Sequence, residues 1–263
     1  MSNNKLIHLI ADYGKGDLAF AEVFQRLQGL NPDDVILPTS VPAFSTLATG
    51  FVISQLALND PIENMTIYSN TAPRKDDTEK RHENVGEPFV YAILENGIVV
   101  CGVHAQYAFS FIKPHIKKFG MVNVENRGSQ FRSRDFYPAG ATAVFNDDKK
   151  AFGDKLDLKH IPEIPKNKIM YADGYGNIKT TIRSSKVTFK PGEKIRINIG
   201  GHIRTGVYAD ANFEVKSGDL AFAPGSSGGS DRFMEIFLRG SSAHKMFFKP
   251  MVESDISLER FED

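Results

Sequence analysis

The chain has 263 residues, of which 41% are hydrophobic and 24% charged, so it can bury a sizeable core in one large or two modest domains. Lys plus Arg and Asp plus Glu number 32 each, which gives no electrostatic case for nucleic acid or an anionic membrane as a partner. The single cysteine, Cys101, excludes an internal disulfide framework and a cysteine-based zinc cluster, and no apolar run approaches a membrane span; these features predict a cytoplasmic protein.

The first part of the chain alternates between strand-like and helix-like patterns. Short apolar runs and helix-periodic stretches follow one another at 6–10 (strand), 16–30 (helix), 35–37 (strand), 44–58 (helix) and 65–68 (strand). Alternation of this kind indicates a mostly parallel sheet covered by helices. The sequence therefore predicts a Rossmann-like α/β domain over residues 1–150.

A charged loop, a hairpin and a further helix complete this predicted domain. Residues 71–88 form a charged loop whose length is typical of functional or disordered segments. The apolar runs 89–94 and 98–103 flank an Asn-Gly turn and predict a hairpin. A helix is expected over 108–119, interrupted by Pro114.

The pattern changes after the first domain. Residues 151–166 are charged and contain several prolines, which is typical of a linker. Residues 167–263 carry short period-two strand patterns at nearly regular spacing. This spacing predicts a small all-β barrel as the second domain.

Four local features are candidates for chemistry, and each has a structural alternative. Asp12 follows the first strand, where a carboxylate can accept from a ribose diol or cap a helix. The segment 173–177 combines a carboxylate, a ring and a carboxamide, or is a hairpin turn. The hydroxyl-rich 224–230 is an anion-binding loop or a plain turn. The two arginines of 131–138 clamp an anion, or one pairs with Asp135. The histidines show no metal-ligand spacing, so no metal site is expected.

The order of these motifs resembles that of the S-adenosyl-L-methionine hydroxide adenosyltransferases, the family that includes fluorinase and chlorinase. Asp12-Tyr13-Gly14 with Asp17 is similar to its T-D-F-G-x-x-D opening. The other similar segments are Phe131-x-x-Arg134-Asp135-x-x-Pro138, Asp173-x-Tyr175-Gly176-Asn177-Ile178-x-Thr180-x-Ile182, Gly225-Ser226-Ser227-Gly228, Met234-Glu235-Ile236 and Gly240-Ser241-Ser242-Ala243. The matches run in the family's order across both predicted domains.

The resemblance implies an activity and an assembly. S-adenosylmethionine would be the substrate, with no separate cofactor, and water would displace methionine from its 5′ carbon to give adenosine and L-methionine. The protein would be a homotrimer with sites between subunits. Asp12 would bind the ribose hydroxyls, and Tyr175 and Asn177 the adenine. Asp173 and Ser226, with Ser227 beside them, would hold the methionine amine and carboxylate.

The chain departs from the family where the nucleophile is activated. The family's acid is Ala72 here, its histidine is Arg132, and its asparagine aligns with His104. Its arginine is recovered only as Arg81, which with His104 is the candidate for the catalytic role. Three hypotheses therefore stay open: a hydrolase with a rebuilt water site, transfer to a small anion such as halide, and binding of S-adenosylmethionine or adenosine without turnover.

Overall fold

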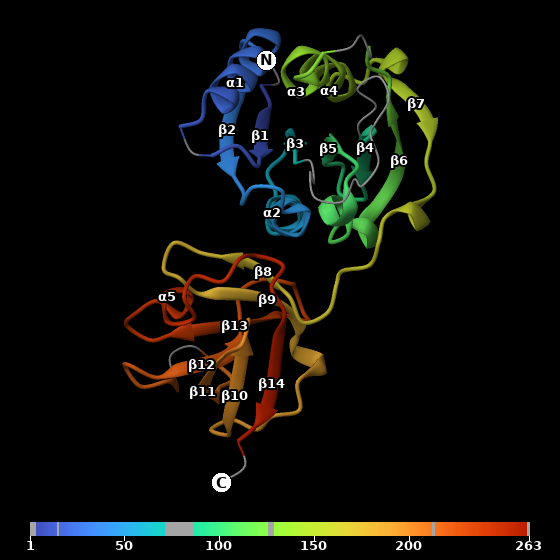
Figure 1. The fold of residues 1–263 in the computed structure, drawn as a ribbon. Helices are drawn as coiled ribbons and strands as arrows, with labels where there is room; N and C mark the ends of the chain where they lie inside the picture. Colours follow the sequence, from blue (N-terminus) through green and yellow to red (C-terminus); the bar gives the residue numbers. More distant parts are fainter. Residues whose placement is uncertain (1–3, 15, 72–86, 126–128, 212–213, 262–263) are drawn as a thin grey trace, which may run out of the picture. The chain divides into compact units, whose positions relative to one another are not determined.

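The chain forms two compact units, Met1–Glu163 and Ile164–Asp263, in the computed structural model (Figure 1). The structure describes residues 4–14, 16–71, 87–125, 129–211 and 214–261. Within these ranges no helix has the length and apolar character needed to cross a membrane. Each unit is built on one seven-stranded sheet.

The first unit is a mixed sheet flanked by helices. The strands run in the order β2-β1-β3-β5-β4-β6-β7. Their bounds are β1 (Leu6–Ala11), β2 (Val35–Ser40), β3 (Met65–Asn70), β4 (Phe89–Leu94), β5 (Val99–Val103), β6 (Ile116–Val122) and β7 (Phe152–Lys155). The neighbours β2, β1, β3 and β5 are parallel, whereas β5, β4, β6 and β7 are antiparallel.

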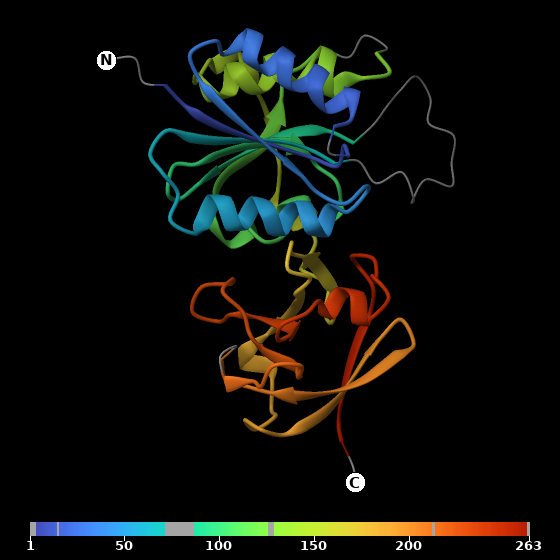
Figure 2. The same cartoon turned by 90° about the vertical axis from the view of Figure 1, so that its left-hand side faces the viewer.

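Helices cover both faces of this sheet, which explains its apolar strands. They are α1 (Leu18–Leu30), α2 (Thr46–Leu58), the short α3 (Arg132–Asp135) and α4 (Tyr137–Phe145). Figure 2 shows α1 and α4 on one face and α2 on the other. Asp17 caps α1 by accepting from the Ala19 N–H, and Ser45 caps α2 by accepting from the Ala48 N–H. Ile7 and Leu9 of β1 are fully buried in the core beneath α1 and α4.

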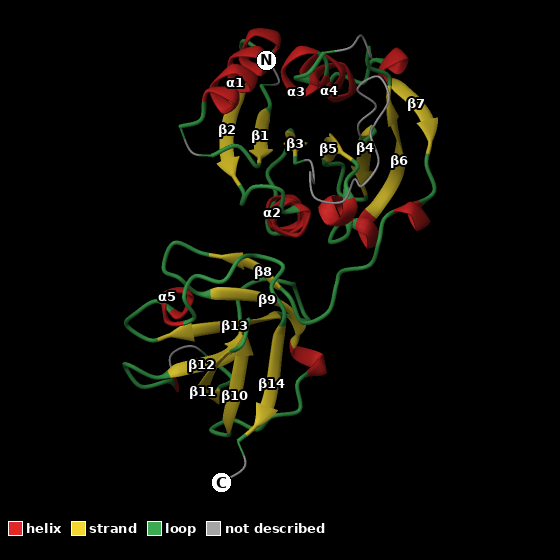
Figure 3. Cartoon of the chain, in the orientation of Figure 1, coloured by secondary structure: helices red, strands yellow, loops and turns green. Residues whose placement is uncertain are grey.

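The second unit is a curved sheet with its own core (Figure 3). Its strand order is β14-β10-β11-β12-β13-β9-β8, antiparallel except for the pair β11–β12. The bounds are β8 (Ile169–Ala172), β9 (Ile178–Arg183), β10 (Lys194–Ile199), β11 (His202–Tyr208), β12 (Leu220–Pro224), β13 (Phe233–Leu238), α5 (Ala243–Met246) and β14 (Ile256–Arg260). Ile195, Ile197 and Ile199 alternate into a core that Phe222 and Phe247 complete.

The predicted fold class, a Rossmann-like domain with a mostly parallel sheet followed by a small all-β barrel, is wrong. The structure is mostly β, and half of the strand pairings in the first sheet are antiparallel. The second sheet is mixed and forms only a half-barrel: β14 and β8 are its edges, and the bridge between Lys168 and Asp255 beside them is isolated. Residues 151–166, expected as a linker, contain β7.

The segment expected as helix 108–119 instead adds a strand to the antiparallel half of the first sheet. It forms two 3-10 turns, Gln106–Phe109 and Lys113–His115, and then β6 pairs antiparallel with β4. The predicted hairpin β4–β5 is confirmed. It reverses the chain direction after the parallel strands, and β6 and β7 extend that antiparallel half of the sheet.

Candidate functional site

A pocket of about 420 Å³ lies at the edge of the first sheet, and we call it the edge pocket. Asp12 directly follows β1 and Asn70 ends β3, and both residues line the edge pocket. Because β1 and β3 are parallel, their carboxyl ends meet at one edge of the sheet, which is where open sheets flanked by helices bind ligands. The local order of strand and helix thus places two polar side chains at a ligand-binding position.

Asp12 does not cap the following helix. The cap of α1 is Asp17, whereas the Asp12 Oδ2 accepts from the backbone N–H of Phe44 at 2.9 Å. Phe44 has a φ of 63°, a left-handed conformation that is costly for a bulky residue. The Asp12 carboxylate therefore stabilises a strained loop at the rim of the edge pocket, and the structural alternative offered for Asp12 is excluded.

A polar network joins three segments on the wall of the edge pocket. The Tyr13 hydroxyl lies 2.6 Å from the Ser133 Oγ, and the Asn70 Nδ2 donates to the same tyrosine oxygen at 2.8 Å. The Tyr68 hydroxyl donates to the Ser133 carbonyl at 2.7 Å. These bonds hold the start of α3 against the ends of β1 and β3. The wall of the pocket is thereby fixed before any ligand arrives.

The two arginines of segment 131–138 have different surroundings. Arg134 pairs with Asp135 at 2.7 Å and with Glu22 at 3.1 Å, so the expected structural Arg–Asp pair is confirmed. The hydrogen bond from Arg134 lowers the pKa of Asp135. Arg132 instead lines the edge pocket, with its guanidinium carbon 5.4 Å from the centre of the Tyr137 ring. It makes no hydrogen bond or ion pair within the described parts of the chain.

The segment 173–177 is the turn between β8 and β9. The Asp173 Oδ1 accepts from the backbone N–H groups of Tyr175 and Asn177, each at 3.0 Å, and the Oδ2 accepts from the Asn177 side chain at 3.0 Å. Gly176 has a φ of 84°, which a glycine adopts without strain. The turn leaves the Tyr175 ring 85% exposed, so this ring is available to stack on a ligand.

The motifs of the second unit contact one another although they are distant in sequence. A side chain at Gly176 would place its Cβ 2.0 Å from the Ser242 Oγ, and the His244 N–H donates to the Gly176 carbonyl at 2.9 Å. A Cβ at Gly225 would lie 2.1 Å from the Glu235 Oε1. Glu235 forms an ion pair with Lys179, directly opposite it on β9. Close packing thus explains why glycine stands at these two positions.

The predicted serines of 224–230 differ in exposure. Ser226 is exposed on the loop, whereas Ser227 is 1% exposed and its hydroxyl has no hydrogen-bond partner among the described residues. A buried hydroxyl without a partner costs free energy, and a bound ligand or water removes that cost.

Of the two candidates for the catalytic role, only His104 is described by the structure, and it does not line the edge pocket. Arg81, Ala72 and most of the loop 71–88 fall outside the described residues. His104 is described, and its ring packs edge-on against Phe109 and Phe119, at centroid distances of 6.2 and 5.4 Å. Burial, and then proximity to His160, lower its pKa.

His104 follows the last residue of β5, Val103, which lines the edge pocket whereas His104 does not. Neighbouring residues of an extended chain point to opposite faces, so a residue one position earlier faces the site. Sequence reasoning also missed the contributions of Asn70, Ser133 and Tyr137 to the pocket wall. Only Asn70 carried a signal, as a polar residue at the end of a parallel strand. In the described ranges no group of three His, Cys, Asp or Glu side chains is placed to hold a metal ion.

Solved structures share this fold. An uncharacterized conserved protein from Thermotoga maritima superposes with a TM-score of 0.75 at 15% identity, over 96% of this chain and 100% of that chain. A conserved hypothetical protein from Thermus thermophilus gives a TM-score of 0.68 at 15% identity, over 97% of this chain and 100% of that one. At this identity the likeness shows the fold alone. No family model and no curated protein matches the chain.

Proposed function

We propose that the protein binds S-adenosyl-L-methionine and displaces its methionine with water, giving adenosine and L-methionine. The observation that carries the proposal is the position of Asp12 at the carboxyl end of β1, lining the edge pocket. The motif resemblance assigns this residue to the ribose. An ionised carboxylate has about four acceptor positions, so Asp12 can hold the Phe44 N–H and still accept from a ribose hydroxyl.

The motif resemblance assigns the remaining contacts to residues of the second unit of a neighbouring subunit. Asp173 uses three of its acceptor positions within its own turn, which leaves capacity for an ammonium group. The exposed Tyr175 ring and the Asn177 carboxamide suit a flat, polar adenine. Ser226 and the partnerless hydroxyl of Ser227 suit a carboxylate. The homotrimer and a cytoplasmic location, which a single buried cysteine suits, remain parts of the same proposal.

The reaction makes modest demands on the protein. Water attacks the 5′ carbon in line with the C–S bond; the new C–O bond forms as the C–S bond breaks, its electron pair passes to sulfur, and the attacking water loses a proton. Because the leaving group is already a sulfonium, positioning and desolvation of the nucleophile supply most of the catalysis. The fixed hydroxyls of Tyr13 and Ser133 are polar groups able to hold such a water at the pocket wall.

Two observations favour the alternatives. Arg132 lacks an ion-pair partner in the described parts of the chain, which favours transfer to a small anion such as halide. His104 packs against phenylalanines and does not line the edge pocket, which favours binding of S-adenosylmethionine or adenosine without turnover. Each alternative predicts a different product in one experiment.

The test is incubation of the purified protein with S-adenosylmethionine, with and without added halide, followed by mass spectrometry of the adenosine-side products. Adenosine with methionine supports the hydrolase, a halogenated adenosine supports anion transfer, and intact, retained ligand supports a binding protein. Asp12→Asn should lose the activity or the binding. Asp33→Asn is the matched control, because it makes the same charge change at an exposed residue that does not line the edge pocket. If the protein neither forms a product nor retains the ligand, the proposal is overturned.

A further inference from the structure

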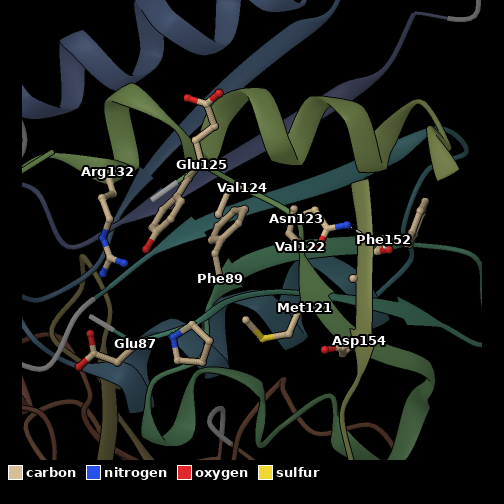
Figure 4. A pocket seen from close by; sticks show the side chains of 13 residues that line it. Glu87, Phe89, Met121, Val122, Asn123, Val124, Glu125, Arg132, Phe152 and Asp154 are labelled. Atoms are coloured by element: carbon tan, nitrogen blue, oxygen red, sulfur yellow. Dashed lines mark hydrogen bonds between the residues drawn. The ribbon is translucent and has the colours of Figure 1, made fainter. Parts of the chain in front are cut away.

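A second pocket in the first unit, of about 650 Å³, lies beside the edge pocket (Figure 4). We call it the side pocket. It is lined from β4, β6 and β7 and by the residues that begin α3 and α4. Glu87, Arg132 and Tyr137 line both pockets, so the two cavities meet at these three side chains. The proposed function uses the edge pocket and leaves the side pocket without a role.

The inner wall of the side pocket is apolar and rigid. Phe89, Val122 and Tyr137 line it and are 2%, 3% and 3% exposed. The rings of Phe89 and Tyr137 stack with centroids 4.2 Å apart and planes 6° from parallel. Side chains locked in this way lose little conformational entropy when a ligand covers them. The pocket therefore suits an apolar group.

Opposite charges lie together at the end of the side pocket that meets the edge pocket. Figure 4 shows the Arg132 guanidinium and the Glu87 carboxylate at the same end of the pocket, with Phe89 nearer its centre. The Tyr137 hydroxyl responds to both: burial raises its pKa, Arg132 lowers it and Glu87 raises it. The guanidinium and this hydroxyl make no hydrogen bond within the described parts of the chain. Both groups can therefore donate to a ligand.

The remaining acidic residues mark the rim. Glu125 and Asp154 line the side pocket but are exposed, and they lie away from Arg132 in Figure 4. A simple anion would be attracted by Arg132 and repelled by the three carboxylates, and a simple cation would be repelled by Arg132. A molecule that carries both charges at one end and an apolar body matches the inner wall and both charges.

We propose that the side pocket binds a free α-amino acid with an apolar side chain. Its carboxylate accepts from Arg132 and from the Tyr137 hydroxyl, its ammonium group faces Glu87, and its side chain covers Phe89 and Val122. The exposed carboxylates at the rim disfavour amino acids with acidic side chains. The site does not depend on the proposed function, because that function assigns no contact with S-adenosylmethionine to Arg132, Glu87 or Tyr137.

The test is calorimetric titration of the purified full chain with L-leucine, in the absence of S-adenosylmethionine. 4-Methylpentanoate and 3-methylbutylamine are the probes that lack the ammonium and the carboxylate. L-leucine should bind, and each single-charge probe should bind roughly tenfold more weakly or worse, since it makes only one of the two charged contacts. Equal binding of leucine and either probe, or no leucine binding at millimolar concentration, would overturn the proposal.

Variants locate the site. Arg132→Gln and Glu87→Gln should each weaken leucine binding by about tenfold or more, and Arg132→Lys should keep part of the affinity. Asp154→Asn is the matched control for Glu87→Gln, and it should bind leucine as the unaltered chain does. An equal loss in Asp154→Asn and Glu87→Gln would refute the assignment. Circular dichroism checks that each variant is folded.

One further variant separates this inference from the proposed function. Asp12 lines the edge pocket and not the side pocket. Asp12→Asn should therefore lose the proposed S-adenosylmethionine binding and keep leucine binding. If Asp12→Asn abolishes leucine binding in a folded protein, leucine occupies the edge pocket and the side-pocket assignment is wrong.

Discussion

The ion pair between Lys179 and Glu235 offers a sharp test of how the second unit is held together. The two residues lie opposite each other on β9 and β13, and their side chains are only 14% and 4% exposed. Glu235→Gln keeps the shape of the side chain but leaves the Lys179 ammonium without its counter-charge. Loss of one partner of a buried pair costs about 3–5 kcal/mol, and the partial exposure of Lys179 puts the expected value near the lower end, at about 3 kcal/mol.

Hydrogen exchange measured by mass spectrometry resolves this cost strand by strand. A loss of about 3 kcal/mol corresponds to a roughly hundredfold faster exchange of the amides of β9 and β13 through their opening reaction. Peptides from β1 and β3 are the internal control, because they belong to the other unit. Replacement of both partners, Lys179→Met with Glu235→Met, should recover much of the protection, since it leaves no buried charge unpaired.

The matched comparison is the exposed pair of Lys168 and Asp255 in the same unit. Asp255 is 84% exposed, so Asp255→Asn should cost no more than about 1 kcal/mol. If Glu235→Gln changes exchange by no more than Asp255→Asn does, burial does not make the Lys179–Glu235 pair important, and the reasoning is refuted.

Three further outcomes follow from the structure. Burial lowers the pKa of His8, so the unfolded chain takes up its proton first and stability should fall as the pH drops below about 6.5. His8→Leu should flatten this pH dependence of the free energy of unfolding, measured with urea. An unchanged pH dependence would contradict the assignment to His8. Gly176→Ala should lower the melting temperature, because the new Cβ would lie 2.0 Å from the Ser242 Oγ and the backbone has a φ of 84°. Adding Ser242→Gly to Gly176→Ala should recover part of the loss. If Gly176→Ala alone melts at the same temperature as the unaltered chain, the packing argument is refuted. Burial raises the pKa of the Cys101 thiol well above its usual value, so a thiol reagent at pH 8 should label it only after denaturant is added. Rapid labelling of the folded protein would contradict this, because it would show that the core around Cys101 opens.

Local sequence patterns predicted the elements up to residue 70 and the β4–β5 hairpin. Those segments have clear apolar periods, and an Asn-Gly turn marks the hairpin. The strand β6 was missed for a definite reason. Its buried positions are 116, 119, 120 and 122, a spacing that also fits one face of a helix. Only the pairing with β4, a partner distant in sequence, decides that this segment is extended.

The candidate site shows the same division. Asp12 was predicted because its place at the end of a strand is a local property. The direction in which the His104 side chain points was not predicted, because a shift of one residue in register moves a side chain to the opposite face. Arg132 is a candidate for binding an anion because it differs from Arg134, whose guanidinium is paired with Asp135 and Glu22. Glu22 lies on α1, and the spacing of arginines in a sequence does not encode that contact.

The reversal of direction at β4 also bears on the order in which the first unit assembles. Val90 pairs with Gly102 across a short turn, whereas Leu9 pairs with Tyr68 only after β2 and two helices intervene along the chain. Closing the longer loop costs more entropy, and hairpins form within microseconds. We expect amides of β4 and β5 to gain protection before those of β1 and β3 in pulse-labelled refolding. The antiparallel half of the sheet would then form first, and the parallel strands would pair onto its edge at β5 afterwards.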